Sequence, residues 1–420
     1  MVILHLNHYQ IKPVRNLVIR PLIKELNKHG ILNIYFDAEE LKNGNWKSRV
    51  IFFILSIKVF FEKVFKNTFT KIHFNFFNIL EQVSIVSSDL ILKKIKKKPD
   101  IIILYWISGS INMKTVYKLQ KKTSAKVYWY FMDKAPMTGG CHYTWDCKQF
   151  ATSGCKDCSA FKFNFLSFIA FKNFKYRQKY IGKLNITALS PTRETSQLIT
   201  KSILFHQKEK IYIPIGIDQT TFIQKEIRTL EFCNINREVG KTYFLAGANN
   251  INDKRKGLQF FIDSLRIIKE RDNNLFKQIR VIIIGKFKYN PFDDIEVDNS
   301  TLGYVNEERL IQLYNFVDAY VCPSIEDSGP LMVNQALTCG TPVIAFNTGV
   351  ARDLITDDNA GYLASMLDIE DFAKGLIMII NRGKKDQNSY KKNNRDMTIQ
   401  KVGMNVSSSK LIDHLIRKTD

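Results

Sequence analysis

The residues best suited to chemistry lie in the C-terminal half of the chain, in segment 321–344. Its apolar start predicts a buried strand that ends at Cys322, and a turn with acidic residues, Ser328 and Gly329 follows. Pro330 favours a helix start, because proline fits the first helical turn. Free backbone amides at a helix start bind anions at the carboxyl edge of a parallel sheet. This segment therefore predicts a phosphate site.

Four of the seven cysteines cluster at Cys141, Cys147, Cys155 and Cys158. The last two form a Cys-x2-Cys pair, which is typical of zinc knuckles, and four thiolates would make a closed structural site. Disulfides are disfavoured in a reducing cytosol. A structural zinc ion and four free thiols both stay open as interpretations.

The elements that must position these residues alternate between strand-like and helical patterns, which predicts two lobes of parallel βαβ units. A chain of 420 residues also exceeds one average domain. We expect domains over 1–210 and 211–400, with 401–420 forming a helix that crosses back to the first domain. The expected strands of the two lobes are 2–6, 32–36, 101–106 and 126–131, then 242–247, 280–285, 319–322 and 342–346.

The bulk composition is that of a globular protein, with 45% hydrophobic and 24% charged residues, which excludes a disordered or collagen-like chain. The formal net charge of +22 calls for an anionic partner, such as a nucleic acid, a membrane surface or a phosphorylated substrate. Residues 1–7 are interpreted as a strand and not as a signal peptide. The most apolar run, 51–61, is shorter than the roughly 20 residues that span a bilayer. We expect a cytoplasmic protein.

Two segments do not fit the alternation. Residues 44–98 are rich in Phe, Ile and Lys, with a polar stripe at Lys58, Glu62 and Lys66, and residues 161–183 interleave aromatic with basic residues. Such a mixture suits the inner face of a membrane, where rings enter the headgroup boundary and cations meet anionic lipid. Core-packing helices with solvated lysines are the alternative. The basic residues of the second segment include Lys162, Lys172, Lys175 and Arg177.

Segment 321–344 resembles the signature of glycosyltransferase family 4, Pro-Ser-x-x-Glu-Gly-Phe-Gly followed by Glu-Ala-x-x-x-Gly-x-Pro-Val. Residues 244–257 resemble the family's diphosphate-binding turn, and residues 213–218 resemble its hinge. In the first lobe, residues 133–143 are similar to a subgroup from bacterial exopolysaccharide and lipopolysaccharide clusters. Most of residues 100–365 are covered. The resemblance implies the GT-B fold, with two Rossmann-like domains facing a cleft, and metal-independent, retaining hexosyl transfer.

The same likeness implies roles for residues on the donor side. Arg255 and Lys256 would neutralise the departing nucleoside diphosphate, which stabilises the transition state electrostatically. Asp327 would lie near the donor sugar, and Gln335 would contact the ribose hydroxyls. The other donor-binding positions are Gly247, Lys254, Ser328, Gly329, Pro330, Leu331 and Met332.

On the acceptor side, the resemblance leaves Asp133 as a catalytic candidate and His142 as an acceptor-binding one. A cysteine-cluster ligand or a packed histidine is the alternative role of His142. The family's active-site histidine is replaced by Met132, and its first-lobe Gly-Gly is absent from residues 8–15. Glutamine in place of the family's glutamate at position 335 predicts donor binding that is weaker by roughly tenfold.

These features favour transfer of a sugar from a nucleoside-diphosphate sugar to a glycan or lipid-linked acceptor in surface-glycan biosynthesis. A non-catalytic GT-B subunit that binds nucleotide-sugar or a partner enzyme is one alternative. A basic nucleic-acid-binding protein is another, although no such motif appears and we expect no nucleic-acid partner. A third is a different GT-B enzyme, such as a nucleotide-sugar epimerase.

Overall fold

A computed structural model describes residues 1–8, 15–76, 79–287, 289–382 and 387–416. The chain divides into two compact units. The first unit comprises Met1–Pro214 and Ser408–Asp420, and the second comprises Ile215–Ser407. The sequence predicts a boundary at residue 210, and the contacts within the structure divide the chain after Pro214.

The first unit is built on a six-stranded parallel sheet with the order β2-β1-β3-β4-β5-β6. Its strands are apolar runs with almost every side chain buried near the centre, which is typical of a parallel sheet covered on both faces. The strands are β1 (Val2–Leu6), β2 (Leu32–Phe36), β3 (Ile101–Leu104), β4 (Lys126–Tyr130), β5 (Ile186–Ser190) and β6 (Lys210–Tyr212).

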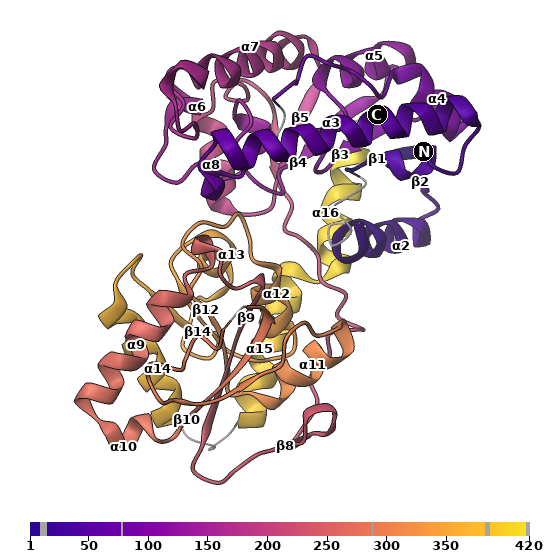
Figure 1. The fold of residues 1–420 in the computed structure, drawn as a ribbon. Coiled ribbons are helices and arrows are strands. Elements are labelled where there is room, and N and C mark those ends of the chain that lie inside the picture. Colours follow the sequence, from indigo (N-terminus) through magenta and orange to yellow (C-terminus); the bar gives the residue numbers. More distant parts are fainter. Residues whose placement is uncertain (9–14, 77–78, 288, 383–386, 417–420) are drawn as a thin grey trace. The chain divides into compact units, whose positions relative to one another are not determined.

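Helices pack around this sheet (Figure 1). Several begin at a side chain that caps the first turn, as Asn112 does when it accepts a hydrogen bond from the Thr115 amide. The longer helices are α2 (Arg20–Lys28), α3 (Trp46–Phe69), α4 (Ser88–Ile95), α5 (Met113–Thr123), α7 (Ser167–Lys183) and α8 (Arg193–Lys201).

The second unit repeats the plan with a parallel sheet in the order β11-β10-β9-β12-β13-β14. The strands are β9 (Thr242–Asn250), β10 (Ile279–Lys286), β11 (Asp298–Thr301), β12 (Ala319–Cys322), β13 (Val343–Phe346) and β14 (Gly361–Ala364). The helices are α9 (Leu258–Arg271), α10 (Asn273–Phe276), α11 (Glu307–Phe316), α12 (Leu331–Thr338), α13 (Gly349–Leu354), α14 (Ile369–Arg382) and α15 (Gln387–Val402).

The last helix, α16 (Met404–Ile416), contributes its final turns to the first unit. There the ring of His414 lies edge-on to Tyr128, with 5.8 Å between ring centroids. A short antiparallel pair, β7 (Thr229–Leu230) with β8 (Ile235–Asn236), stands apart from both large sheets. In the part of the chain that the structure describes, no helix is long and apolar enough to cross a membrane.

The polar stripe of α3 does not face solvent. Lys58 and Glu62 form an ion pair of 3.2 Å whose side chains are only 8% and 3% exposed. Lys66 is half-buried and donates a hydrogen bond to Asn75. The alternative of a core-packing helix with solvated lysines therefore holds only in part for α3, since Leu55 and Val59 pack in the core but the Lys58 side chain is buried. Arg177 is buried as well, so it does not belong to a basic surface.

Candidate functional site

The family-like turn of the second unit follows strand β12 directly. The strand ends at Cys322, and helix α12 begins at Leu331. Pro330 occupies the N-cap position with φ −64°, and no side chain caps this helix start among the described residues. The helix start lies at the carboxyl edge of the sheet, where first-turn amides can bind an anion, and the phosphate site itself stays a prediction.

The basic tripeptide forms a short 3-10 turn, Lys254–Lys256, that packs against the end of β12. Asp253 caps it by accepting a hydrogen bond from the Arg255 amide at 3.1 Å. Gly257 then adopts φ +65°, where a Cβ atom would lie 1.8 Å from the carbonyl oxygen of Pro323. Only glycine permits this close approach, because it has no Cβ and tolerates positive φ. The tripeptide is thereby fixed beside the turn before α12.

The cations of the tripeptide face the acidic residues of this turn. Lys256 donates to the Asp327 carboxylate, and an Arg255 Nη1 atom lies 4.0 Å from it. Arg255 also donates to the Glu326 carbonyl at 3.2 Å and to the Asp253 carboxylate at 2.5 Å. The backbone joins the two segments as well, since the Ile325 amide donates to the Arg255 carbonyl at 2.9 Å. Arg255, Lys256 and Asp327 therefore form one cluster.

The electrostatics of the cluster favour an ionised aspartate. Burial raises the pKa of Asp327, but Lys256 and Arg255 outweigh burial, and the pKa lies below its ordinary value. The Asp327 carboxylate also accepts a hydrogen bond from the Gly329 amide at 3.1 Å. Because Lys256 is already paired with Asp327, a diphosphate must compete with this carboxylate for the ammonium group.

Two positions that support the cluster escaped the sequence analysis. Gly349, at the start of α13, approaches the turn so closely that a Cβ atom would lie 2.8 Å from the Asp327 carbonyl oxygen. Asp253 caps the basic tripeptide and pairs with Arg255. An aspartate directly before the tripeptide is a recognisable capping signal. No local pattern reveals the contact of Gly349, because it depends on the tertiary arrangement.

The other predicted donor residues are placed in different ways. Lys254 is exposed, Ser328 is buried, and Gly329, Pro330, Leu331 and Met332 are half-buried around the start of α12. Gly247 lies within β9, where a Cβ atom would meet Ile284 at 2.3 Å. Its carbonyl accepts a hydrogen bond from Tyr320 at 3.4 Å.

Gln335 is only 3% exposed, on the part of α12 that faces the core. Its Oε1 atom accepts a hydrogen bond from the Tyr314 hydroxyl at 3.2 Å. Burial raises the pKa of Tyr314, so this hydroxyl stays protonated and able to donate. The amide oxygen is therefore engaged within the protein, and the predicted contact of Gln335 with a ribose stays a prediction.

In the first unit, the structure brings Asp133 and His142 together. The His142 Nδ1 atom lies 2.6 Å from an Asp133 carboxylate oxygen, and both residues are buried. The Trp106 ring stacks on the imidazole with 4.3 Å between centroids. Met132 lines the same small cavity as these three residues. An aspartate that orients a histidine beside a cavity can support acid–base chemistry.

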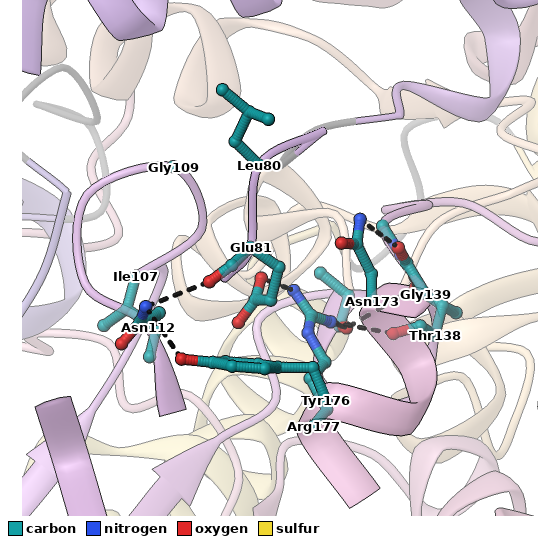
Figure 2. A network of polar contacts seen from close by, with 12 residues as sticks. Leu80, Glu81, Ile107, Gly109, Asn112, Thr138, Gly139, Asn173, Tyr176 and Arg177 are labelled. Carbon is teal, nitrogen blue, oxygen red and sulfur yellow. Dashed lines mark hydrogen bonds and ion pairs between the residues drawn. The ribbon is translucent and has the colours of Figure 1, made fainter. Parts of the chain in front are cut away.

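A buried polar network holds the loop that carries His142 (Figure 2). Arg177 on α7 donates to the Thr138 carbonyl at 2.8 Å and pairs with Glu81 at 3.1 Å. Asn173, also on α7, donates to the Gly139 carbonyl at 3.1 Å. Because these groups are buried and paired, the network fixes the loop. The loop in turn positions His142 against Asp133.

The clustered cysteines are free thiols within the first hydrophobic core, with Cys147 less buried than the others. A hydrogen bond with Cys158 and burial raise the pKa of Cys141. Over the described ranges, no group of three or more histidine, cysteine, aspartate or glutamate side chains is arranged to hold a metal ion. The zinc site at Cys141, Cys147, Cys155 and Cys158 stays a prediction. The observed pairing of His142 is with Asp133.

A larger cavity of about 930 Å³ lies elsewhere in the second unit, between residues 221–232 and α11. None of the predicted donor-binding residues lines it. Its walls carry both carboxylates and cations, and the start of α11 at this cavity is already capped by Asn306, which accepts a hydrogen bond from the Arg309 amide. The chemistry of the β12–α12 turn fits a diphosphate better than this cavity does.

Comparisons with known proteins bear on the family and on the fold. Residues 234–397 match the family model of glycosyl transferases group 1. The chain is 24% identical over 266 residues to a putative colanic acid biosynthesis glycosyl transferase, WcaC, of Escherichia coli K12, covering 60% of this chain and 59% of the relative. It is 22% identical over 217 residues to an Escherichia coli UDP-Gal:alpha-D-GlcNAc-diphosphoundecaprenol alpha-1,3-galactosyltransferase, covering 49% of this chain and 54% of the relative.

The chain thus spans a little over half the length of these curated relatives. Among solved structures, it is similar to sucrose-phosphate synthase from Thermosynechococcus elongatus, with a TM-score of 0.64 and 12% identity over 100% of this chain and 99% of that one. This likeness shows the fold alone. The two parallel α/β units therefore have the GT-B fold, and the match over 234–397 supports a glycosyltransferase family for this chain.

Proposed function

We propose that this protein is a retaining hexosyltransferase of family 4, which moves a sugar from a nucleoside-diphosphate sugar to a lipid-linked or polysaccharide acceptor in surface-glycan biosynthesis. One observation carries the proposal: Arg255 and Lys256 converge on Asp327 directly before a helix start that no side chain of the described residues caps. Cations and free amides together suit a diphosphate. The relatives' names support the acceptor classes, since one is named for colanic acid and one for a diphosphoundecaprenol.

The chemistry follows from where negative charge develops. When the glycosidic bond breaks, charge accumulates on the leaving diphosphate, and Arg255 and Lys256 stabilise that charge in the role that a metal ion has in other enzymes. Lys256 exchanges the Asp327 carboxylate for a phosphate oxygen. Asp327 is then free to accept a hydrogen bond from a hydroxyl of the donor sugar.

In retaining transfer the acceptor attacks from the face that the diphosphate leaves, so a donor phosphate oxygen can accept the proton. The first unit then needs to orient the acceptor hydroxyl more than to deprotonate it. We propose this role for Asp133 and His142, which are paired and buried beside a cavity of only about 10 Å³. We further propose that the protein works in the cytoplasm at the inner membrane face, without a nucleic-acid partner and without a metal in catalysis.

A second candidate is a non-catalytic GT-B subunit that binds nucleotide-sugar. It is favoured by Met132 in place of the family histidine and by Gln335, whose amide oxygen is occupied by Tyr314. The two candidates agree on donor binding and differ on turnover.

Thermal unfolding with UDP, GDP or ADP and their sugars tests both candidates. A ligand at a hundredfold its dissociation constant stabilises by about 2.7 kcal/mol. The Arg255→Ala/Lys256→Ala double variant should fold but no longer be stabilised by the ligand. It should also no longer release the sugar from the nucleoside-diphosphate sugar. Full activity in the double variant would exclude the transferase assignment. Donor binding by the wild type without hydrolysis or transfer would favour the non-catalytic subunit.

A further inference from the structure

Helix α3 exposes a continuous apolar face. Eight large apolar side chains on it are between 40% and 69% exposed, namely Trp46, Val50, Phe53, Ile54, Ile57, Phe60, Phe61 and Val64. They recur at intervals of three and four residues, so they lie on one side of the helix. Scattered apolar residues are ordinary on a protein surface, but an ordered face of this length marks an interaction surface.

The opposite side of α3 faces the protein and combines the core residues Leu55 and Val59 with a buried ion pair. Glu62 is buried and paired with Lys58, and Lys58 also donates to the Gly109 carbonyl at 3.1 Å. Burial raises the pKa of Glu62 even though Lys58 lies beside it. A helix of a water-exposed domain usually buries its phenylalanines and solvates its charges. In α3 only Leu55, Val59 and a few partly buried apolar side chains face the core, while four phenylalanine-sized or larger side chains (Trp46, Phe53, Phe60 and Phe61) face outward, which indicates that the outer face meets an apolar phase.

A second apolar strip continues the surface beyond the end of α3. Thr70 forms an antiparallel bridge with Phe161, and the Lys162 amide donates to the Phe69 carbonyl at 2.9 Å. The start of α7 and the turn before it therefore lie beside the C-terminal end of α3. The exposed aromatic side chains there are Phe163, Phe165 and Phe168, which are 49%, 73% and 51% exposed.

The charge around these apolar strips has one sign. Glu62 is the only acidic residue in 43–80, and none occurs in 158–193. The cations flank the rings, and the ammonium group of Lys172 lies 5.6 Å from the ring centroid of Phe168. The exposed basic residues of the two segments include Lys47, Arg49, Lys63, Lys71, Lys162, Lys172 and Lys175.

We propose that this surface, the outer face of α3 together with residues 161–168, docks on an anionic lipid bilayer. The helix lies in the plane of the headgroups, its aromatic and aliphatic side chains enter the acyl boundary, and the flanking cations bind anionic headgroups. Charge complementarity favours a bilayer over a second copy of the chain, because two copies would bring the same cations together. The inference does not rest on the proposed transfer reaction, since it concerns attachment only.

Co-sedimentation of the full chain with vesicles tests the proposal. The wild type should bind vesicles of phosphatidylcholine with phosphatidylglycerol, and should bind phosphatidylcholine alone far less. Phe53→Ser with Phe60→Ser should weaken this binding by about tenfold or more, because two exposed rings no longer enter the boundary. Added salt should weaken wild-type binding, as expected for contacts to anionic headgroups.

The matched control is Tyr289→Ser with Tyr304→Ser, two rings of the second unit that are 82% and 73% exposed. This control should bind vesicles as the wild type does. The proposal is overturned if the wild type ignores anionic vesicles, if it binds both vesicle types equally, or if the α3 variant binds unchanged. If the wild type binds no vesicles but forms a dimer, and the α3 variant is a monomer, then a second copy of the chain and not a bilayer covers this surface. Nucleoside diphosphate binding should be unchanged in all variants, so loss of attachment is distinguishable from loss of the donor site.

Discussion

Alanine at position 257 should separate the basic tripeptide from the turn before α12. At φ +65°, alanine costs roughly 1–2 kcal/mol because its Cβ crowds the backbone. The Cβ would also lie 1.8 Å from the Pro323 carbonyl oxygen, which belongs to the backbone and cannot rotate away. The tripeptide must therefore move, and the bond from the Ile325 amide to the Arg255 carbonyl is the first to be strained.

Gly303→Ala is a matched control, because Gly303 has φ +63° and, within the described part of the chain, its virtual Cβ has no neighbouring atom within 4 Å. It carries the backbone cost without the clash. Urea unfolding should show a loss of about 1–2 kcal/mol for the control, with unchanged titration of nucleoside diphosphates. Gly257→Ala should lose more stability and bind nucleoside diphosphate at least about tenfold more weakly, because a displaced cation loses a charge-assisted bond worth about 1.5–3 kcal/mol. If Gly257→Ala and Gly303→Ala lose the same stability and bind nucleoside diphosphate equally well, packing of the tripeptide against β12 is not required for diphosphate binding.

Three further outcomes are expected. Lys256→Ala should raise the dissociation constant of nucleoside diphosphate by about tenfold or more in calorimetry. The control Lys269→Ala removes a surface cation that is paired with a glutamate at 2.9 Å, and it should leave the dissociation constant unchanged. Equal effects of the two variants would contradict a specific contact of Lys256 with the diphosphate. The pKa of Asp327 lies below 3.8, so the stability of the wild type relative to Asp327→Asn should be constant near neutral pH and shrink as pH falls below about 4; a difference that grows in acid would refute the ion pairing. Burial lowers the pKa of His5 from 6.5 to about 4. The free energy of unfolding should therefore fall as pH drops from 6.5 towards 4, with a slope of up to about 1.4 kcal/mol per pH unit, and His5→Gln should remove this slope. A slope that the variant leaves unchanged would show that His5 titrates alike in the folded and unfolded states.

Eight strands of the two sheets could be predicted because parallel strands buried on both faces appear as short apolar runs. The strands β5, β6, β11 and β14 were not among those expected. The run at 280–285 corresponds to β10 (Ile279–Lys286), and the run at 101–106 to the shorter β3 (Ile101–Leu104). Strand ends were less certain than strand cores, because residues after Leu104 leave the ladder while staying buried. Burial alone therefore does not define a strand.

The elements around the turn between β12 and α12 could be predicted from local spacing, since a strand, a turn with Gly329 and a helix that begins after Pro330 follow one another. The pairing of Lys256 with Asp327 could not, because it joins residues 71 positions apart. The buried hydrogen bond of Gln335 with Tyr314 could not be predicted either, because a position on a helix does not show which residue its side chain contacts.

The orientation of α3 shows a second limit of sequence patterns. Spacing identifies the faces of a helix, and the stripe of Lys58 and Glu62 was recognised in this way. Spacing does not say which face is turned inward. The usual rule that charges face solvent fails for Lys58 and Glu62, whose ion pair is buried, while Phe53 is 64% exposed.

The most direct test of the central claim is a crystal structure of the protein with a bound nucleoside diphosphate. The diphosphate oxygens should lie within about 3 Å of the Arg255 guanidinium and of the Leu331 or Met332 amide, with the Lys256 ammonium moved from Asp327 to a phosphate. A nucleotide bound in the cavity between residues 221–232 and α11, with Lys256 still on Asp327, would contradict the account.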